Sequence, residues 1–464
     1  MDTLMLSAHG LLDELHRGRV SSLDIVEASL ERIDALDDRL KAFIAVDAEG
    51  ARAAARKSDR ERASGSTLGL LHGLPVAIKD VTATAGLLTT QGSRIFADNV
   101  PTQDEESVAR LRKAGAIIIG KTNTPEFAFG AVCSNALRGP TCNPWDTRLT
   151  SAGSSGGSAV AVSTGMVPLA QGTDFGGSVR TPASFCGCIG LRPTPGIIPE
   201  PRRALGWSSL ATQGVLARNV KDASLMVSVM AGMHPGDPTS LKPCWPTGET
   251  RKPRVAASLT LNGAFRVDDE VGDAFYHACR QAEPVFGTLH DVKPDLDGSL
   301  QAFKTLRAAE SWVKFGRMVD EHENQLTESY VWNVRQGRHI TAEEYLNAEM
   351  ARTRTWRTFQ RMFENVDILL MPAASVMPFP NSQGEVMTVG GQPCESIIDY
   401  LACTFIVSLV GFPALSIPAP RKADELPFGV QMIARPGQEA MLLHAAQLME
   451  EAGFQHQWPH LTPS

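Results

Sequence analysis

The sequence predicts an α/β fold in which one large β-sheet is covered on both faces by α-helices. Between residues 68 and 232, short β-branched runs alternate with Gly/Ser-rich turns and helical stretches of small residues, which is typical of strands buried between helices. Strand-like runs return near the C-terminus. A chain of 464 residues can bury a large core, so it needs neither disulfides nor a metal to fold.

The N-terminal half is expected to begin with helices and to continue with alternating strands and helices. Segment 1–65 is predicted to be helical, because apolar residues recur at helical spacing behind the N-cap residues Ser21 and Ser22: Leu23, Val26, Leu30 and Ile33. Strands are predicted at 76–78, 117–119 and 167–170, with a helix at 158–164.

The C-terminal half is expected to add a helical embellishment and then to return to strands. Residues 299–365 are polar and helical in pattern, with a capping box at Thr341 and Glu344 and an apolar stripe of Trp356, Phe359 and Phe363. Strands are predicted at 368–371 and 414–417, followed by a helix through 441–449. Length alone suggests about three domains. No repeat or linker divides the chain, so we expect one large domain, 66–464, with its core at 68–232, behind the helical segment 1–65.

The charge balance argues against a nucleic-acid-binding protein. The chain has 44 Lys plus Arg against 51 Asp plus Glu and a net charge of -7, whereas binding to phosphates needs massed cations. The one short basic cluster, Arg-Lys-Pro-Arg at 251–254, is predicted to be a solvated loop before a strand.

Neither a membrane segment nor a metal site is expected, and a cytoplasmic protein is predicted. The N-terminus lacks the basic and apolar regions of a signal peptide. The longest apolar stretch, 401–415, is interrupted and shorter than the ~20 residues of a membrane helix. The eight cysteines form no C-x-x-C pair, and Cys186 and Cys188 have poor metal-ligand spacing and are expected to pack as small apolar groups.

A phosphate-loop pattern, G-x-x-x-x-G-K-[ST], is present at 115–122. Its interior, Ala-Ile-Ile-Ile, is a strand sequence unsuited to a tight anion-binding turn, and Asn-Thr-Pro at 123–125 interrupts any following helix. A buried strand is therefore the favoured interpretation, and a nucleotide-dependent switch remains an alternative of a different class.

Two further catalytic patterns are rejected as motifs, the second of them as a chance match. Residues 153–157 match the G-x-S-x-G nucleophile elbow, but a loop and not an apolar strand precedes them, and no late histidine has distinctive surroundings. Residues 311–314 match S-x-x-K, but no S-D-N or K-T-G accompanies them.

A lysine and two Gly/Ser-rich blocks are the segments most suggestive of catalysis. Lys79 ends the apolar run Pro-Val-Ala-Ile at 75–78, where burial lowers the pKa of a lysine towards neutrality. The other interpretation is a lysine that reaches water beside Asp80. The first block is Ser-Ala-Gly-Ser-Ser-Gly-Gly-Ser at 151–158, and the second is Gly-Thr-Asp-Phe-Gly-Gly-Ser-Val-Arg at 172–180.

Together these segments resemble the amidase signature family of serine hydrolases. The resemblance is strong over about 68–232, including the segments at 86–93, 121–130 and 185–194, and weaker at 411–418 and 426–431. It implies the fold of that family, a large mixed β-sheet covered on both faces by α-helices.

The resemblance also implies a Ser–cis-Ser–Lys triad. Ser178 is expected to be the nucleophile, Ser154 the relay that follows a cis peptide bond, and Lys79 the neutral base. Neutrality at pH 7 requires the pKa of Lys79 to fall by ~3 units, which Asp80 opposes unless its carboxylate points away or is paired.

Further residues are expected to support this triad. The backbone N–H groups of Phe175, Gly176, Gly177 and Ser178 are expected to form the oxyanion hole. Ser155, Asp174 and Arg180 are expected to be supporting residues: Asp174 orders the loop by hydrogen bonds, and Arg180 matches an arginine common across the family. Ala152 stands where the family usually has glycine, so this turn is expected to differ slightly.

The expected activity is hydrolysis of a C–N bond, in an amide, a carbamate or a urea-like linkage, through an acyl-enzyme on Ser178 and without cofactor or metal. The main alternative is the glutaminase (A-type) subunit of a tRNA-dependent amidotransferase, which works with partner subunits. The expected ligand is a small-molecule amide or carbamate, and a homodimer is among the open oligomeric states. The pocket walls are expected within 299–400. Four aromatic residues are candidates for the lining, with core packing as the other interpretation: Phe129, Phe185, Trp207 and Trp332.

Overall fold

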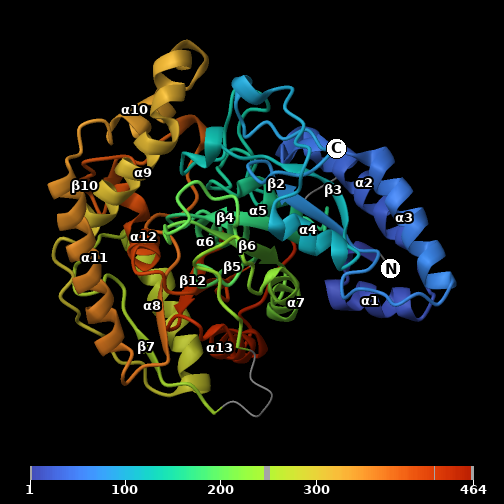
Figure 1. Ribbon diagram of the computed structural model, residues 1–464. Helices are drawn as coiled ribbons and strands as arrows, with labels where there is room; N and C mark the ends of the chain where they lie inside the picture. Colours follow the sequence, from blue (N-terminus) through green and yellow to red (C-terminus); the bar gives the residue numbers. More distant parts are fainter. Residues whose placement is uncertain (1–2, 245–250, 423, 461–464) are drawn as a thin grey trace.

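The computed structural model describes residues 3–244, 251–422 and 424–460. Ten strands form one mixed sheet: β1 (Phe43–Val46), β2 (Pro75–Lys79), β3 (Ile117–Thr122), β4 (Leu169–Asp174), β5 (Ile189–Arg192), β6 (Thr212–Ala217), β7 (Val255–Ala257), β8 (Ile368–Pro372), β11 (Ala414–Pro418) and β12 (Gly429–Ile433). Their order across the sheet is β1-β3-β2-β4-β6-β5-β11-β12-β8-β7 (Figure 1). A separate pair consists of β9 (Thr388–Val389) and β10 (Gln392–Pro393). Strands from both halves of the chain therefore share one sheet.

Helices surround this sheet (Figure 1). In the described residues they are α1 (Ala8–His16), α2 (Ser22–Leu40), α3 (Ala48–Ala63), α4 (Glu106–Lys113), α5 (Gly156–Ser163), α6 (Arg180–Cys186), α7 (Val220–Met230), α8 (Asp269–Phe286), α9 (Ser299–His322), α10 (Glu328–Arg335), α11 (Ala342–Met362), α12 (Ala402–Leu409) and α13 (Glu439–Glu451). Short 3-10 helices are η1 (Thr3–Met5), η2 (Arg94–Phe96), η3 (Glu126–Ala128), η4 (Glu323–Gln325), η5 (Asn381–Gln383) and η6 (Asp399–Leu401).

The strands between the two edges of the sheet are buried on both faces and send alternate side chains to opposite sides. Leu370 of β8 and Val76 of β2 pack in the core that α7, α8 and α13 share. Leu369 packs on the other face with residues of α9 and α12, and Ala77 packs there with residues of α5. Lys79, two positions after Ala77, points to this second face, where α5 lies.

Parallel pairing within the mixed sheet places the carboxyl ends of β2 and β4 side by side. β2 is parallel to both β3 and β4, and β7 is parallel to β8, while the other pairs in the sheet are antiparallel. Since the carboxyl ends of β2 and β4 lie at the same edge, the residues that end these strands are brought together there.

The helical segment predicted at 1–65 needs one correction. Helix α2 begins at Ser22 with Ser21 as its N-cap, and the side chain of Ser21 accepts from the N–H of Asp24. Between α2 and α3, however, β1 forms the sheet edge, and its Phe43 pairs with Thr122 of β3. A four-residue edge strand is too short to interrupt the helical periodicity of its surroundings.

The predicted C-terminal elements are present, but the prediction that Trp356 belongs to the buried apolar stripe is wrong. Strands β8 and β11 and helix α13 cover the predicted ranges, and Thr341 caps α11 through a capping box with Glu344. Phe359 and Phe363 are fully buried, but Trp356 is 42% exposed. The apolar stripe therefore has two buried members, and Trp356 lies at its solvent edge.

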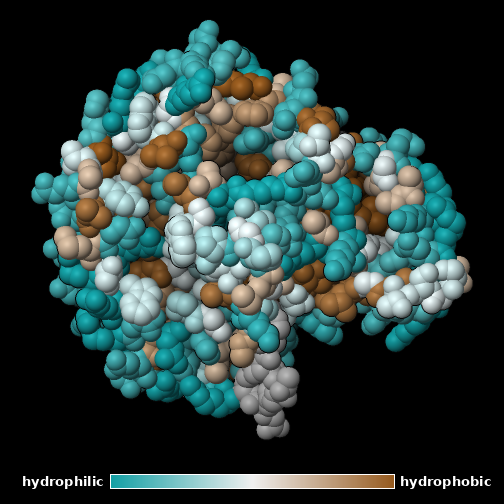
Figure 2. All heavy atoms as spheres, in the orientation of Figure 1, coloured by the Kyte–Doolittle hydropathy of each residue, from teal (hydrophilic) through white to brown (hydrophobic). Residues whose placement is uncertain are grey.

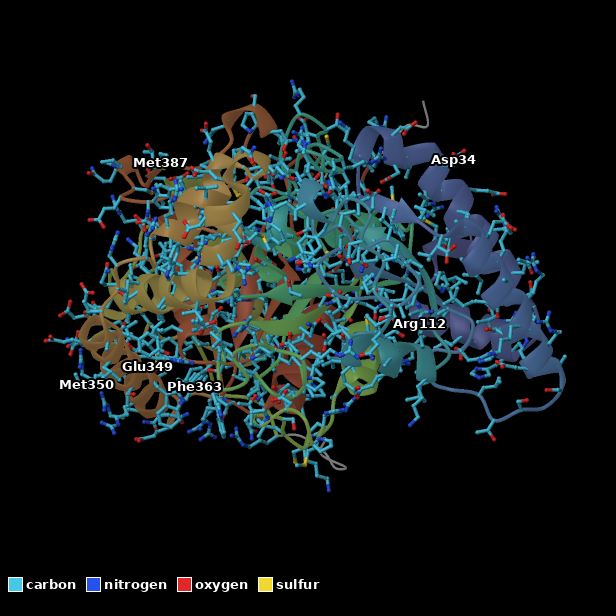
Figure 3. All side chains as sticks on the ribbon, turned by 45° about the horizontal axis from the view of Figure 1, so that its top comes forward. Asp34, Arg112, Glu349, Met350, Phe363 and Met387 are labelled. Atoms are coloured by element: carbon cyan, nitrogen blue, oxygen red, sulfur yellow. The ribbon has the colours of Figure 1, made fainter. Side chains whose placement is uncertain are left out.

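Outer helices carry polar side chains into solvent. In Figure 3, Asp34 of α2 and Glu349 of α11 lie at opposite rims of the molecule. The basic cluster at 251–254 is a loop before β7, and Arg251 and Arg254 both form ion pairs with Asp367. No helix in the described ranges is long and apolar enough to cross a membrane.

Candidate active site

Lys79 lies at the carboxyl end of β2, with its ammonium group against the start of α5. Its Nζ donates to Ser154 Oγ at 2.6 Å and to Thr173 Oγ1 at 2.9 Å. Lys79 and Ser154 are buried, so both hydrogen bonds lie in a region of low dielectric. Thr173 comes from β4, the parallel neighbour of β2. The lysine is thereby held between a strand and a helix start.

Burial gives this lysine the properties of a base. It lowers the pKa of Lys79 to about 7, although the nearby Cys133 and Asp174 oppose the shift. Desolvation penalises the charged form, and the two hydroxyl partners do not supply a counter-charge. Near neutral pH a substantial fraction of Lys79 is therefore unprotonated.

Asp80 does not act as a counter-ion for Lys79. Its carboxylate turns to the loop after β2, where it accepts hydrogen bonds from the N–H groups of Thr90 at 3.1 Å and Gly92 at 3.2 Å and from the Thr90 hydroxyl at 2.5 Å. Lys121 of β3 provides the nearby positive charge for Asp80. The carboxylate next to Lys79 in sequence is thus directed away from it.

Ser154 sits in the turn that leads into α5, and the Gly153–Ser154 peptide bond is cis. α5 packs closely against the end of β3: a Cβ on Gly157 would lie 2.4 Å from the backbone O of Ala42 and N of Asn123. Only glycine permits this approach. Ala152, one residue before Gly153, has φ 58° and is fully buried, so the turn adopts the left-handed conformation with alanine in place of glycine.

Ser178 lies in the loop between β4 and α6, next to the Ser154 turn. The N–H of Ser155 donates to the carbonyl of Ser178 at 3.0 Å, and the Ser155 hydroxyl donates to the carbonyl of Thr173 at 3.2 Å. These bonds fasten the two Gly/Ser-rich blocks together. The Ser178 hydroxyl itself has no hydrogen-bond partner within the described residues, and Ser178 lines a cavity.

Asp174 and Arg180 fix the Ser178 loop through buried hydrogen bonds. Asp174 accepts from the N–H of Gly177 at 2.9 Å and of Val179 at 3.1 Å. Arg180 donates to both carboxylate oxygens, from Nε at 3.0 Å and Nη2 at 2.9 Å. Burial alone would raise the pKa of Asp174, but the charges of Arg180 and Arg192 and the hydrogen bond from Arg180 outweigh it and hold the pKa well below its usual range.

Arg180 is enclosed by protein on all sides. It also donates to the carbonyl of Thr404 at 2.9 Å, to Gln431 Oε1 at 2.9 Å and to Ser408 Oγ at 2.7 Å. These acceptors lie on α12 and β12. Arg180 therefore fastens the Ser178 loop to the C-terminal half of the sheet and does not face the cavity.

The four N–H groups predicted for the oxyanion hole are not equivalent. That of Gly177 is already bonded to Asp174 Oδ1, so it is not free for a substrate oxygen. In the part of the chain that the structure describes, no acceptor is bonded to the N–H groups of Phe175, Gly176 and Ser178. The Gly176–Gly177 peptide is held at both ends, because Thr404 Oγ1 donates to the Gly176 carbonyl at 2.6 Å.

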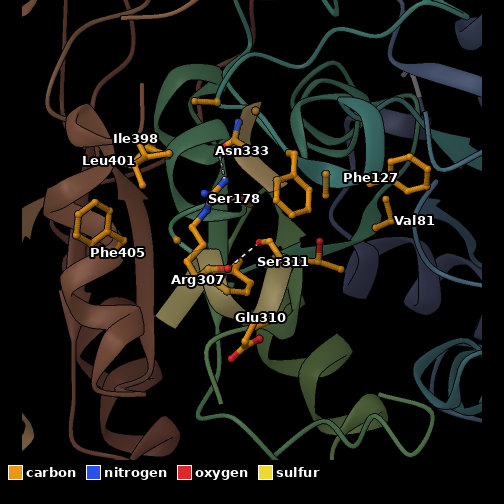
Figure 4. Close-up of a pocket in the computed structure, with 18 of the residues that line it drawn as sticks. Val81, Phe127, Ser178, Arg307, Glu310, Ser311, Asn333, Ile398, Leu401 and Phe405 are labelled. Carbon is orange, nitrogen blue, oxygen red and sulfur yellow. Dashed lines mark hydrogen bonds between the residues drawn. The ribbon is translucent and has the colours of Figure 1, made fainter. Parts of the chain in front are cut away.

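A cavity of ≈ 310 Å³ lies in front of Ser178 (Figure 4). Its walls come from the loop after β2, the segment 127–131, the Ser178 loop at 173–178, residues 211–213 at the start of β6, helices α9 and α10, and the segment 385–405, with Glu105 and Glu200 at single positions. Phe129, Phe303 and Phe405 give it an apolar lining, while Arg307 and Asn333 add polar groups. Figure 2 shows an apolar recess on this side of the molecule, beside α9 and α10. A volume of this size suits a small molecule.

Of the four aromatic residues predicted as candidates for the lining, only Phe129 lines this cavity. Phe185 is buried against Phe379. Trp207 is 80% exposed, and Trp332 lines a separate cleft on the outer side of α9. The expected range 299–400 supplies only part of the wall, from α9, α10 and residues 385–398. The wall continues through Leu401 of η6 to Phe405 of α12, and the rest of it comes from segments before residue 214.

Neither the phosphate-loop pattern at 115–122 nor the S-x-x-K pattern at 311–314 forms a site of its own. The phosphate-loop pattern is the buried strand β3, and Lys121 donates to Thr84 Oγ1 at 2.9 Å and Thr89 Oγ1 at 3.1 Å, which excludes a phosphate loop. Ser311 and Lys314 do line the cavity, but Ser311 donates to the Arg307 carbonyl and Lys314 pairs with Glu310. Within the described residues, no group of three or more His, Cys, Asp or Glu could hold a metal.

Two residues of the site are not evident from the sequence motifs. Thr173 lies in the second Gly/Ser-rich block, but the sequence motifs assign it no role. A hydroxyl at the end of a strand, next to Asp174, could have indicated a hydrogen-bond partner for Lys79. Arg307 gives no signal, since a single arginine on a polar helix is ordinary.

Known proteins resemble this chain over nearly its whole length. A family model described as Amidase matches residues 24–443. The A-type subunit of the glutamyl-tRNA(Gln) amidotransferase of Moorella thermoacetica is 33% identical over 98% of both chains. An acylamidase of Rhodococcus erythropolis is 32% identical over 96% of this chain and 95% of its own. A solved structure from work on the origins of an s-triazine catabolic enzyme has 30% identity and a TM-score of 0.87, over 97% of this chain and 99% of that one.

Proposed function

Because this chain belongs to the amidase signature family of C–N hydrolases, we propose that it cleaves a small-molecule carboxylic amide, carbamate or urea-like linkage through an acyl-enzyme on Ser178. The observation that carries this proposal is the buried hydrogen bond between Lys79 and Ser154 beside a loop whose serine opens to a cavity. No other cavity-lining serine has this arrangement within the described residues: Ser311 bonds to its own helix.

The proposed reaction starts with proton transfer through the relay. Ser178 Oγ attacks the carbonyl carbon while its proton passes to Ser154 Oγ, and the proton of Ser154 passes to neutral Lys79. The N–H groups of Phe175, Gly176 and Ser178 stabilise the oxyanion. Lys79 then returns a proton through Ser154 to the departing nitrogen as the C–N bond breaks. A water molecule, deprotonated by the same relay, hydrolyses the acyl-enzyme. We expect the hydrogen bond between the Ser178 and Ser154 hydroxyls to form when substrate binds, because catalytic hydrogen bonds often tighten only in the complex.

Covalent labelling tests the nucleophile. A fluorophosphonate probe should label the wild-type chain with one equivalent, and Ser178→Ala should abolish both labelling and amide turnover. Ser228→Ala, a change at an exposed serine of α7, is the matched control and should label like wild type. Stoichiometric labelling of Ser178→Ala would overturn the assignment.

A second candidate function is the glutaminase subunit of an amidotransferase. It is favoured by the 33% identity to the A-type amidotransferase subunit of Moorella thermoacetica over nearly the whole chain. Glutamine hydrolysis that appears only when partner subunits are added would support it. Turnover of simple amides by the isolated chain, with no increase on adding such subunits, would favour the independent hydrolase.

A further inference from the structure

The cavity in front of Ser178 contains an arginine with unused hydrogen-bond donors. Arg307 of α9 lines this cavity, its Nη2 donates to Asn333 Oδ1 at 2.7 Å, and its guanidinium lies 5.2 Å from the centre of the Phe129 ring. Figure 4 shows Arg307, Asn333 and Ser178 at the same cavity. Within the described residues, Arg307 Nε and Nη1 have no acceptor, and no carboxylate lies within 4.0 Å of the guanidinium.

Three other charged groups of the wall are ion-paired. Lys314 pairs with Glu310 at 3.2 Å, and Glu310 also accepts from Ser208 at 2.6 Å. Glu200 accepts from the Gln213 side chain at 2.8 Å and pairs with Arg203. Arg307 therefore differs from these three side chains, because it has no ion-pair partner among the described residues of the wall.

Glu385 is the acidic residue that acts on Arg307, but it does not form an ion pair with it. Its attraction opposes the effect of burial, which lowers the pKa of Arg307 to about 10. Burial also raises the pKa of Glu385. One oxygen of Glu385 accepts weakly from Ser329 at 3.4 Å, and the other is buried without a partner. Arg307 thus remains cationic at neutral pH without a close counter-ion.

Arg307 is half-buried. A partly desolvated cation without a counter-ion costs free energy, which a ligand anion in contact with it would recover. Its Nε, its Nη1 and the second hydrogen of Nη2 can make the two parallel hydrogen bonds that a carboxylate accepts. Asn333 and the Phe129 ring fix the plane of the guanidinium, so little ordering is needed on binding.

We propose that Arg307 is a specificity-determining residue that binds a carboxylate of the substrate, so the preferred substrates are small amides with a carboxylate close to the scissile C–N bond. This inference rests on the proposed hydrolase function, because it places the amide at Ser178 and the carboxylate at Arg307 in one cavity of ≈ 310 Å³. Short dicarboxylic acid monoamides have this chemistry.

The test compares malonamate, succinamate and glutaramate with their diamides, which replace the carboxylate by a neutral group of nearly the same shape. Ammonia release gives kcat and KM, and slowing of fluorophosphonate labelling measures occupancy for slow substrates. In wild type, the best monoamide should exceed its diamide ~10- to 100-fold in kcat/KM or in protection, the range expected for hydrogen bonds to a charged group.

Variants locate the preference. Arg307→Gln should bring the monoamide-to-diamide ratio close to one, mainly through a higher KM for the monoamide, and Arg307→Lys should give an intermediate ratio. Glu385→Gln should increase the ratio, because it removes the acidic group whose charge competes with the substrate carboxylate for the guanidinium. Arg317→Gln removes the same charge from an exposed position on the same helix and should keep the wild-type ratio.

The outcomes separate this inference from the function on which it rests. Suppose that the wild type is labelled and active, but that each diamide equals or exceeds its monoamide in kcat/KM and in protection. That result overturns the role of Arg307 and leaves the hydrolase function intact. Retention of the monoamide preference in Arg307→Gln, or no increase in Glu385→Gln, also overturns it. If the wild type shows no labelling and no turnover, both proposals are overturned together.

Discussion

Lys79 Nζ and Ser154 Oγ lie 2.6 Å apart, and both side chains are buried. A lysine with its pKa lowered to about 7 by burial is neutral above that pH and can accept the proton of Ser154. Deprotonation of the base therefore increases as the pH rises. In wild type, kcat/KM should rise about tenfold per pH unit below about 7 and level off above it, which a pH–rate profile measures.

A second buried lysine provides the control for this profile. Burial also lowers the pKa of Lys121 to about 7, but its Nζ is bonded to the loop at 82–89, away from the serines. Lys121→Met should keep the inflection near 7, whereas residual activity of Lys79→Ala should lack it. The opposite pattern would assign the titration to Lys121.

The burial of Lys79 has a cost in stability. Between about 7 and 10.5 the folded chain binds fewer protons at Lys79 than the unfolded chain does, so its contribution becomes more favourable as the pH rises through this window. Lys79→Met removes the penalty, on the order of 4 kcal/mol at pH 7, and loses two hydrogen bonds of about 1 kcal/mol each. The variant should be inactive but about 1–3 kcal/mol more stable at pH 7, with a smaller gain at pH 9.5, by urea denaturation. A gain that does not change with pH would contradict this origin.

Replacing Arg180 should lower the stability of the fold and disturb the Ser178 loop. Arg180→Met leaves the buried Asp174 with only Arg192 as a counter-ion and removes the links to α12 and β12, and loss of one partner of a buried pair costs ~3–5 kcal/mol. Denaturation should show this loss, and fluorophosphonate labelling of Ser178 should slow. Arg148→Met breaks an ion pair whose arginine is exposed and should change stability by at most ~1 kcal/mol. Similar losses in both variants would argue against this role for Arg180.

The sequence predicted which residues come together better than it predicted their surroundings. Lys79, Ser154 and Ser178 stand in dense motifs at strand and helix ends, where local sequence sets the backbone. The orientation of Asp80 depended on a loop ten residues away that supplies three donors, and nothing at Asp80 itself encodes that choice. Arg307 depends on which helix packs over the sheet, because its surroundings come from Phe129 and Asn333, which are distant in sequence. The short edge strand β1 was missed since its partner, β3, lies more than seventy residues later.

Thr404 offers a test of the oxyanion geometry that leaves the triad untouched. Its hydroxyl donates to the Gly176 carbonyl at 2.6 Å while Asp174 accepts from the Gly177 N–H, so the peptide between these glycines is held at both ends. Thr404→Val keeps the shape but leaves that carbonyl without the hydroxyl donor, which should cost about 1–2 kcal/mol of stability. The neighbouring N–H groups stabilise charge only in the transition state, so we expect kcat to fall about 10-fold with KM nearly unchanged. Thr404→Ser keeps the hydroxyl and should retain most of kcat. A fall in kcat of the same size in both variants would show that packing of the methyl group, and not the hydrogen bond, orients the loop.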